Sequence, residues 1–386
     1  MRREARGPTA GRAVPVALAA AILLGCGGEG RREGGLSAAA EARHLAALGD
    51  ADAVVRVEAA RALGGARSAA AVDALMAALG DERGSVRDAA AGSLGAIGDG
   101  RAVGRLVAAM ERQTTVDLRT GAGSATMALA GFGEAAVGPL MEALSDERSF
   151  VRGQAAWALG RIGSAAAVRA LAERLGSDAE ADVRAAAAEA LGRIGDAGAV
   201  EGLLGALGSG PIEVRTASAR ALGRIGDGRA SGRLAASLGD EDEEMRIAAA
   251  GALGSLGDAG TVPALSRALG DEVAHVRAAS AKALGEIGVK AAVGPLVEAL
   301  GDGDWRVRAH AARSLGIIED AGATAALAEA LGDEHGRVRL TAARALGRIG
   351  DGRARDALAR AAREDADEGV RTAAAAALEQ AAGGER

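Results

Sequence analysis

The sequence predicts an all-α protein, an α-solenoid in which about eleven two-helix repeats stack in a row. A phrase of the form Val-Arg-x-x-Ala-Ala-x-Ala-Leu-Gly-x-Ile-Gly recurs through most of the 386 residues, usually at intervals of 31 or 32. Apolar residues in each repeat follow the i, i+3, i+4, i+7 spacing of one helix face. The chain is 49% hydrophobic but only 1% aromatic, so alanine and aliphatic side chains must form many thin packed layers.

The composition excludes several other classes of protein. Almost no bulky side chain is available for a conventional α/β enzyme core. The 25% of charged residues alternate with regularly placed Leu, Val and Ile, which argues against disorder. A single cysteine excludes an intramolecular disulfide and any Cys-x-x-Cys metal site.

Residues 1–25 predict an export signal that is separate from the fold. Four arginines and Glu4 precede an uncharged apolar run over 13–25, which is shorter than the roughly 20 residues of a spanning helix. The run ends in Leu23-Leu24-Gly25-Cys26, and the segment resembles a bacterial lipoprotein signal peptide. The resemblance implies cleavage before Cys26 and lipidation of that residue. An ordinary export signal, or a chance apolar run ahead of a buried cysteine, are the alternatives.

The resemblance also implies a cellular location for the protein. We expect it to be exported and lipid-anchored in the cell envelope. In lipoproteins an Asp directly after the cysteine signals retention in the inner membrane, whereas Gly27 stands here and favours the outer membrane. Residues 26–36 are rich in glycine and predict a flexible tether. Loss of four arginines and Glu4 would lower the formal net charge from −6 to −9.

Residues 37–386 form the predicted repeat domain. The arginine of the phrase marks ten copies, and Ala128-Leu129-Ala130-Gly131-Phe132-Gly133 ends an irregular eleventh copy. The ten arginines are Arg56, Arg87, Arg152, Arg184, Arg215, Arg246, Arg277, Arg308, Arg339 and Arg371. One helix pair cannot bury its own apolar face, but a stack of pairs can. In the irregular third copy, residues 110–121 replace a short turn, and they are either a neutral insertion or a hinge.

An acidic residue accompanies nearly every repeating arginine. On a helical wheel the arginine lies on the apolar side, so it needs a partner. An aspartate stands six residues before it in nine of ten copies, with Ser209 the exception. We expect an Asp–Arg ladder that satisfies turn amides and guanidinium donors together. The aspartates are Asp50, Asp81, Asp146, Asp178, Asp240, Asp271, Asp302, Asp333 and Asp365.

The opposite side of each second helix predicts a solvent face, which we define as the positions two before and two, five and nine after the arginine. Cations dominate the last two of these positions. The residues there are Arg61, Glu189, Arg220, Lys282, Arg313 and Arg344, then Arg161, Arg193, Arg224, Glu286 and Arg348. They either form a basic lane for an acidic partner surface or complement the helix dipole, which favours cations at C-termini by roughly 0.3–1 kcal/mol.

Two aromatic residues interrupt the polar character of this face in the fourth repeat. Phe150 and Trp157 share one stripe with Gln154 and Arg161, either as a binding hot spot or as local packing. Trp305, beside a turn, is expected to pack locally. The predicted partner-binding residues are Phe150, Gln154, Trp157, Arg161, Arg193, Arg220, Arg224, Arg313 and Arg344.

The repeats resemble HEAT repeats of the short phycobilisome-lyase type over about nine tenths of the chain. The resemblance rests on the recurring phrase and on the first-half segments such as 71–79 and 292–300. It implies an α-solenoid that winds as a right-handed superhelix, with second helices lining the concave surface and an Asp–Arg ladder along the stack. The motif is specific for the fold and uninformative about function.

The sequence predicts a scaffold that binds another protein, without catalytic activity. The four histidines lie far apart and none stands in a His-x-x-x-His or His-Glu pair, unlike the ligands of the di-iron HEAT hydroxylases. We therefore expect no metal, and we expect no cofactor. Nucleic acid is not an expected partner, because an exported protein rarely meets it. A chaperone-like or lyase-type carrier of a small ligand or chromophore is the alternative function.

Overall fold

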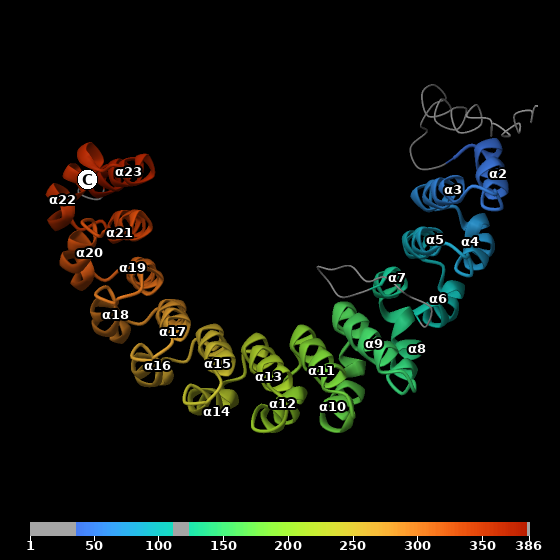
Figure 1. The fold of residues 1–386 in the computed structure, drawn as a ribbon, viewed down its shortest axis with the longest axis horizontal. Coiled ribbons are helices and arrows are strands. Elements are labelled where there is room, and N and C mark those ends of the chain that lie inside the picture. The colour runs from blue at the N-terminus through green and yellow to red at the C-terminus, as the bar shows by residue number, and fades with distance from the viewer. Residues whose placement is uncertain (1–35, 111–122, 384–386) are drawn as a thin grey trace, which may run out of the picture. The chain divides into compact units, whose positions relative to one another are not determined.

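The computed structural model describes residues 36–110 and 123–383. In these ranges the chain forms twenty-two α-helices and ten short 3-10 helices without a strand, which confirms the predicted all-α solenoid. The α-helices form eleven consecutive pairs (Figure 1). The predicted signal peptide, Cys26 and the tether up to residue 35 lie outside the described residues. So do residues 111–122, nearly all of the insertion in the third repeat.

The helices form two compact units, residues 1–136 and 137–386. The first unit holds three pairs: α2 (Ala38–Ala47) with α3 (Ala53–Gly65), α4 (Val72–Ala78) with α5 (Gly84–Ile97), and α6 (Val103–Met110) with α7 (Ser124–Gly131). Second helices pack on second helices, α3 on α5 and α5 on α7. Each unit is therefore a stack of helix pairs in chain order.

The second unit holds eight pairs, whose second helices lie side by side along one side of the row (Figure 1). The first helices are α8 (Val137–Ala143), α10 (Val168–Ser177), α12 (Val200–Leu207), α14 (Ser231–Ser237), α16 (Val262–Ala268), α18 (Val293–Ala299), α20 (Thr324–Ala330) and α22 (Arg355–Glu364). The second helices are α9 (Ser149–Ile162), α11 (Ala181–Ile194), α13 (Ile212–Ile225), α15 (Glu243–Leu256), α17 (Ala274–Ile287), α19 (Trp305–Ile318), α21 (Gly336–Ile349) and α23 (Glu368–Gly383).

Short 3-10 turns join one pair to the next, and aspartates begin most of them. The side chain of Asp258, for example, accepts a hydrogen bond from the N–H of Gly260 and fixes the entry to the turn. The turns are Ala69–Ala71, Gly100–Ala102, Gly133–Ala136, Ala165–Ala167, Ala197–Ala199, Gly228–Ala230, Ala259–Thr261, Lys290–Ala292, Ala321–Ala323 and Gly352–Ala354.

The Leu-Gly step of the repeat phrase allows close helix packing. Gly192 of α11 lies so near α13 that a methyl group in its place would be 2.6 Å from Cα of Ala221. The equivalent glycine in α13, Gly223, approaches Ala252 of α15 in the same way, at 2.8 Å. The small residues are therefore required by the stacking itself, which explains how alanine can form most of the core.

The final glycine of the phrase ends the second helix. Gly195, Gly226 and five equivalents adopt positive φ at the C-cap, a conformation that costs other residues about 1–2 kcal/mol. In the ninth repeat Glu319 occupies this position at φ 58°. The sequence thus supplies glycine at most positions where the backbone turns left-handed after second helices, and the exceptions are Glu319 and, after α3, Arg67 at φ 52°. The right-handed superhelical path stays a prediction.

Candidate binding groove and the Asp–Arg ladder

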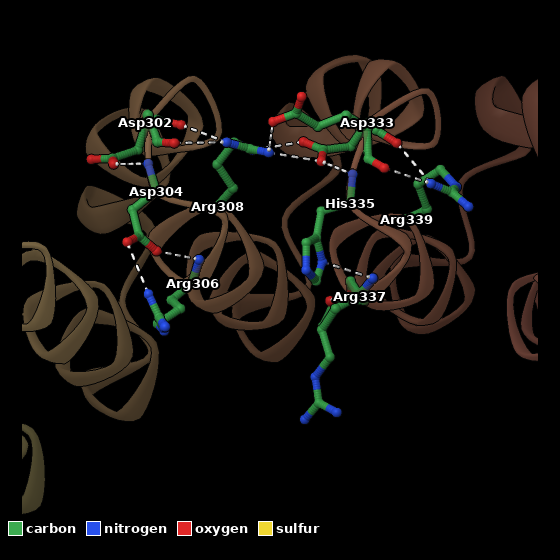
Figure 2. A network of polar contacts seen from close by, with 11 residues as sticks. Asp302, Asp304, Arg306, Arg308, Asp333, His335, Arg337 and Arg339 are labelled. Atoms are coloured by element: carbon green, nitrogen blue, oxygen red, sulfur yellow. Dashed lines mark hydrogen bonds and ion pairs between the residues drawn. The ribbon is translucent and has the colours of Figure 1, made fainter.

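The Asp–Arg ladder runs through the turns that begin the second helices. Arg308 donates from Nη1 to the carbonyl oxygen of Asp302 at 2.9 Å (Figure 2). Its Nε and Nη2 donate to the two carboxylate oxygens of Asp333, in the following repeat, at 2.7 and 2.9 Å. Asp333 also accepts the N–H of His335 at 2.8 Å. One arginine therefore connects the turns of two repeats, and the aspartate also shapes its own turn.

The prediction that each arginine pairs with the carboxylate of the aspartate six residues before it is wrong. The aspartate six residues before each arginine contributes its main-chain carbonyl, and the carboxylate partner belongs to the next repeat. The bridging pairs in the described ranges are Arg56–Asp81, Arg152–Asp178, Arg215–Asp240, Arg246–Asp271, Arg277–Asp302, Arg308–Asp333 and Arg339–Asp365. The side chain is long enough to span the seam between repeats, and its fork matches a carboxylate there in a bidentate geometry.

The ladder is interrupted where the sequence lacks the next aspartate. Arg184 donates to the carbonyl oxygens of Asp178 and Ala179, but Ser209 stands at the position of the next carboxylate. Arg215, which follows Ser209, reaches Asp240 through Nη1 alone, and its buried Nε has no hydrogen-bond partner in the described chain. A single serine thus alters the contacts of two arginines.

The remaining predicted ladder residues use local partners. Arg87 donates to the carbonyl oxygen of Asp81 at 2.8 Å, as the pattern requires. Asp146 pairs with Arg148 of its own turn at 2.8 Å. The side chain of Asp50 accepts the N–H of Asp52. Arg87 and Asp146 flank the irregular third repeat, whose sequence lacks the aligned Asp and Arg, and Asp50 belongs to the first described helix pair.

Ion pairing also holds two of the ladder carboxylates, those of Asp178 and Asp365, in their charged form. Hydrogen bonds from Arg152 lower the pKa of Asp178, and those from Arg339 lower the pKa of Asp365. Burial opposes this effect in both residues, since a charged group loses hydration, but the guanidinium contacts outweigh it.

The solvent face is narrower than the helical wheel predicts. All nine cations at the positions five and nine after the arginine are exposed. Gln154, two after Arg152, is instead buried at 7% exposure, and the residues two after the arginine in the other regular repeats lie buried or half-buried. The expectation that Gln154 faces a partner is therefore wrong. Close stacking of second helices, with glycine against alanine, places this row of residues in the seam.

The aromatic stripe in the fourth repeat has two arginines close to one of its rings, that of Trp157. Phe150 is 42% exposed, while Trp157 is half-buried. The guanidinium groups of Arg161 and Arg193 lie over the indole ring, 5.4 and 5.8 Å from its centroid. Arg161 comes from α9 itself and Arg193 from α11, so Trp157 bridges two repeats through cation–π contacts.

A basic groove crosses the second helices α15, α17, α19 and α21 in the second unit. Its volume is about 820 Å³. Six cations line it, and no Asp or Glu does. We use the name basic groove for this site and its charged residues, which are Lys282, Arg306, Arg313, Arg337, Arg344 and Arg348 with His275 and His310. The groove includes Arg313 and Arg344 of the predicted site and none of its other residues.

Helix dipoles do not explain this arrangement of charges. Arg348 lies in the last turn of α21, where the dipole favours a cation. Lys282, Arg313 and Arg344 lie in the middle of their helices, and Arg306 and Arg337 are the second residues of α19 and α21, where the dipole disfavours them. Figure 2 shows Arg306 and Arg337 extending away from the ladder. The sequence pattern could have identified these two, because they stand two before the repeating arginine.

Most of the groove's positive charge is not compensated. Lys282 pairs with Glu286 at 3.2 Å, and Arg306 with Asp304 at 3.1 Å. Arg313, Arg337, Arg344 and Arg348 form no ion pair with any described residue. The half-buried His310 lies among them, and its pKa is lowered by burial and by Arg313, Lys282 and Arg337. The imidazole is therefore neutral near pH 7, and it lies in the positive electrostatic potential of these cations.

An aromatic pair forms one edge of the groove. Trp305, the first residue of α19, stacks on His335, the N-cap of α21, with ring centroids 4.1 Å apart and planes at 2°. Arg306 lies over the indole at 5.1 Å. The expectation that Trp305 packs locally is met by this contact, which also brings the ring to the rim of a charged site.

The described residues contain neither a metal-binding cluster nor a spanning helix. Among them no group of three or more His, Cys, Asp or Glu side chains is placed to hold a metal ion. Residues 36–110 and 123–383 also contain no helix of the length and apolarity needed to cross a membrane.

Several solved structures are similar to this chain, and the likeness to Kap95p shows the fold. Kap95p, in a complex with RanGDP, shares 15% identity with this chain over 90% of it and 55% of Kap95p, with a TM-score of 0.62. The phycocyanin lyase CpcE–CpcF complex from Nostoc shares 24% identity over 64% of this chain and 94% of that chain, with a TM-score of 0.40. Human deoxyhypusine hydroxylase shares 26% over 64% and 97%, with a TM-score of 0.30.

Sequence comparison identifies the repeats. No curated protein matches the sequence. The family profile described as HEAT repeats matches residues 41–126, 121–192, 175–240, 231–304 and 293–379, which is most of the chain. These matches span the eleven helix pairs, and HEAT solenoids are a fold typical of protein-interaction scaffolds. The chain belongs to the HEAT-repeat family.

Proposed function

We propose that this protein is a non-enzymatic scaffold that binds a partner protein through the solvent face of its second helices, with the basic groove as the main contact. The observation that carries the proposal is the cluster of cations in a groove of about 820 Å³ whose lining contains no acid. Arg337 near a helix N-terminus and the mid-helix Arg313 and Arg344 gain nothing from the helix dipole or from an ion pair with a described residue. Binding is the function that gives them a use.

The lining also argues against catalysis in the groove. Its only hydroxyl is that of Thr341, which donates to the carbonyl oxygen of Arg337 within α21. No carboxylate lines the groove, so none of the lining residues can orient His310 as a general base. An acid–base pair or an activated nucleophile would need one of these arrangements.

Site-specific cross-linking tests the binding proposal. A photoreactive amino acid at Thr341, in the groove, should cross-link a partner when the protein is in its native envelope. The same residue at Glu329, exposed on the first helix α20, is the matched control. Cross-links from Glu329 but not from Thr341 would refute the groove as the contact. A purified protein that is coloured or carries a bound small molecule would favour the carrier function instead.

The proposal includes a lipid anchor at Cys26, in the outer membrane of a bacterial envelope. It is supported by the basic, apolar and Leu-Leu-Gly-Cys succession of residues 1–26. Cys26→Ala should leave unprocessed precursor and abolish labelling by a fatty acid. A serine substitution outside the signal, such as Thr341→Ser, should label as the unaltered protein does. Labelling that persists in Cys26→Ala would contradict the anchor.

A further inference from the structure

The cations of the basic groove repeat with the helices. Each of the helices α17, α19 and α21 contributes one residue five after its repeating arginine: Lys282, Arg313 and Arg344. Arg306 and Arg337 form a parallel row two residues before the arginine. Neighbouring packed helices are about 8–10 Å apart. A ligand that crosses the groove along the stack therefore meets a cation about every 10 Å.

An extended polypeptide fits this spacing. In the polyproline II conformation its backbone advances about 3.1 Å per residue with three residues per turn, so every third side chain points to the same side after about 9 Å, or one helix layer. We propose that the basic groove binds an extended acidic segment of a partner protein, with carboxylates at every third residue facing successive helices. This inference rests on the proposed scaffold function and names the chemistry of its partner.

The charge balance of the site fits carboxylates. Arg313, Arg337, Arg344 and Arg348 have their guanidinium groups available, and a guanidinium can bind a carboxylate through two parallel hydrogen bonds. His310, at the seam between the rows, is kept neutral by burial and by Arg313, Lys282 and Arg337. An acidic segment would relieve this field, so its binding should also raise the pKa of His310.

A nucleic acid fits the site less well. Single-stranded nucleic acids are bound by aromatic side chains that stack successive bases, whereas the groove has one stacked pair, Trp305 on His335, at its edge. The whole chain carries a formal net charge of −6, which repels a long polyanion outside the groove. A short acidic segment avoids that repulsion, because it contacts only the basic groove.

Binding of designed peptides to the purified full chain tests the inference. One fluorescein-labelled peptide carries glutamate at every third position, and a second has the same composition with its glutamates clustered. We expect the spaced peptide to bind about tenfold more tightly by fluorescence anisotropy, and affinity to fall with salt. In a Trp157→Phe background, quenching or enhancement of Trp305 emission on binding would place the peptide at the groove.

Matched variants locate the contact. Arg313→Gln and Arg344→Gln should each weaken the spaced peptide about two- to fivefold, as exposed ion pairs do. Arg233→Gln and Arg267→Gln change two exposed arginines of the first helices α14 and α16, outside the groove and the solvent face, and should leave its affinity unchanged. His310 should titrate at a higher pH in the complex than in the free protein by NMR. Circular dichroism confirms that each variant is folded.

Several outcomes would overturn the inference. Equal affinity for both peptides would refute the three-residue spacing, and an unchanged affinity of the Arg313→Gln, Arg344→Gln double variant would refute the site. Tighter binding of a single-stranded oligonucleotide of equal charge would assign the groove to nucleic acid. If the peptides fail but Thr341 still cross-links a partner, the acidic segment is wrong and the scaffold function stands.

Discussion

Arg277 binds the carboxylate of Asp302, in the following repeat, while Asp271 in its own repeat offers a main-chain carbonyl. Nε and Nη2 of Arg277 lie 2.7 and 2.9 Å from the two carboxylate oxygens of Asp302, and Nη1 lies 2.9 Å from the Asp271 oxygen. The arginine thereby links the turns of two neighbours. In a solenoid, where each repeat contacts only the next, such a link contributes to the interface energy on which stability depends.

We expect Arg277→Ala to lower the free energy of unfolding by about 2 kcal/mol. The change leaves the carboxylate of Asp302, which is largely buried, without its main partner. Arg313→Ala, on the solvent face, should change it by less than about 0.5 kcal/mol. Urea midpoints measure both. A double-mutant cycle should give a larger interaction free energy between Arg277 and Asp302 than between Arg277 and Asp271. The reverse order would contradict a ladder that links neighbouring repeats.

Gly192→Ala should destabilise the protein by about 1–3 kcal/mol. Its new methyl group would lie 2.6 Å from Cα of Ala221, so α11 and α13 would have to separate. Gly202→Ala is the matched control, because this exposed glycine of α12 has nothing within 4 Å of the new methyl group. It should stabilise by about 0.5–1 kcal/mol. Thermal unfolding that shifts in the same direction for both would argue against close stacking.

Glu319→Gly should stabilise the protein by about 1 kcal/mol. Glu319 ends α19 at φ 58°, where equivalent positions hold glycine. Glycine adopts this conformation without the clash that a Cβ causes. Gly288→Ala, at φ 72° after α17, should lower stability by a similar amount. Chemical unfolding measures the free energy of unfolding of both variants. A lower free energy of unfolding for Glu319→Gly would show that the glutamate has a compensating contact.

Ser209→Asp should extend the ladder and raise the unfolding midpoint. The new carboxylate would stand where Arg184 lacks a partner in the next repeat, and the bidentate pairs elsewhere show the geometry it can reach. The gain should be about 1 kcal/mol, the usual net value of a hydrogen-bonded contact. In an Arg184→Ala background the same substitution should gain nothing. An equal gain in both backgrounds would assign the effect to the turn.

Acidification should destabilise the second unit partly through His310. Burial and the cations around it lower its pKa below the ordinary value of 6.5. The unfolded chain therefore binds the proton more readily than the folded chain does. The contribution of the neutral imidazole to the free energy of unfolding is complete above about pH 6.5 and is lost as pH falls below that value. His310→Gln should flatten the dependence of the urea midpoint on pH between about pH 7 and 5. A slope as steep as that of the unaltered chain would contradict the assignment.

The sequence alone determined the fold to a large extent. The period of 31 or 32 residues fixed the number of helix pairs, and the apolar spacing fixed their type, because a helix pair of this composition can bury its apolar side only against a copy of itself. It also placed cations on the exposed face. These features depend on contacts between near neighbours in the chain, and the periodic pattern records them directly.

Only the tertiary structure decided which residues meet across repeats. Arg277 has an aspartate six residues before it and another 25 residues after it, and the spacing along the chain cannot say which carboxylate lies within reach. Gln154 is polar and at an exposed position of an isolated helix, yet the neighbouring helix covers it. The basic groove likewise collects side chains from four helices, α15 to α21. The ladder partner, the burial of Gln154 and the assembly of the groove all depend on the distance and lateral offset between stacked helices. That distance and offset follow from how side chains of adjacent repeats interlock.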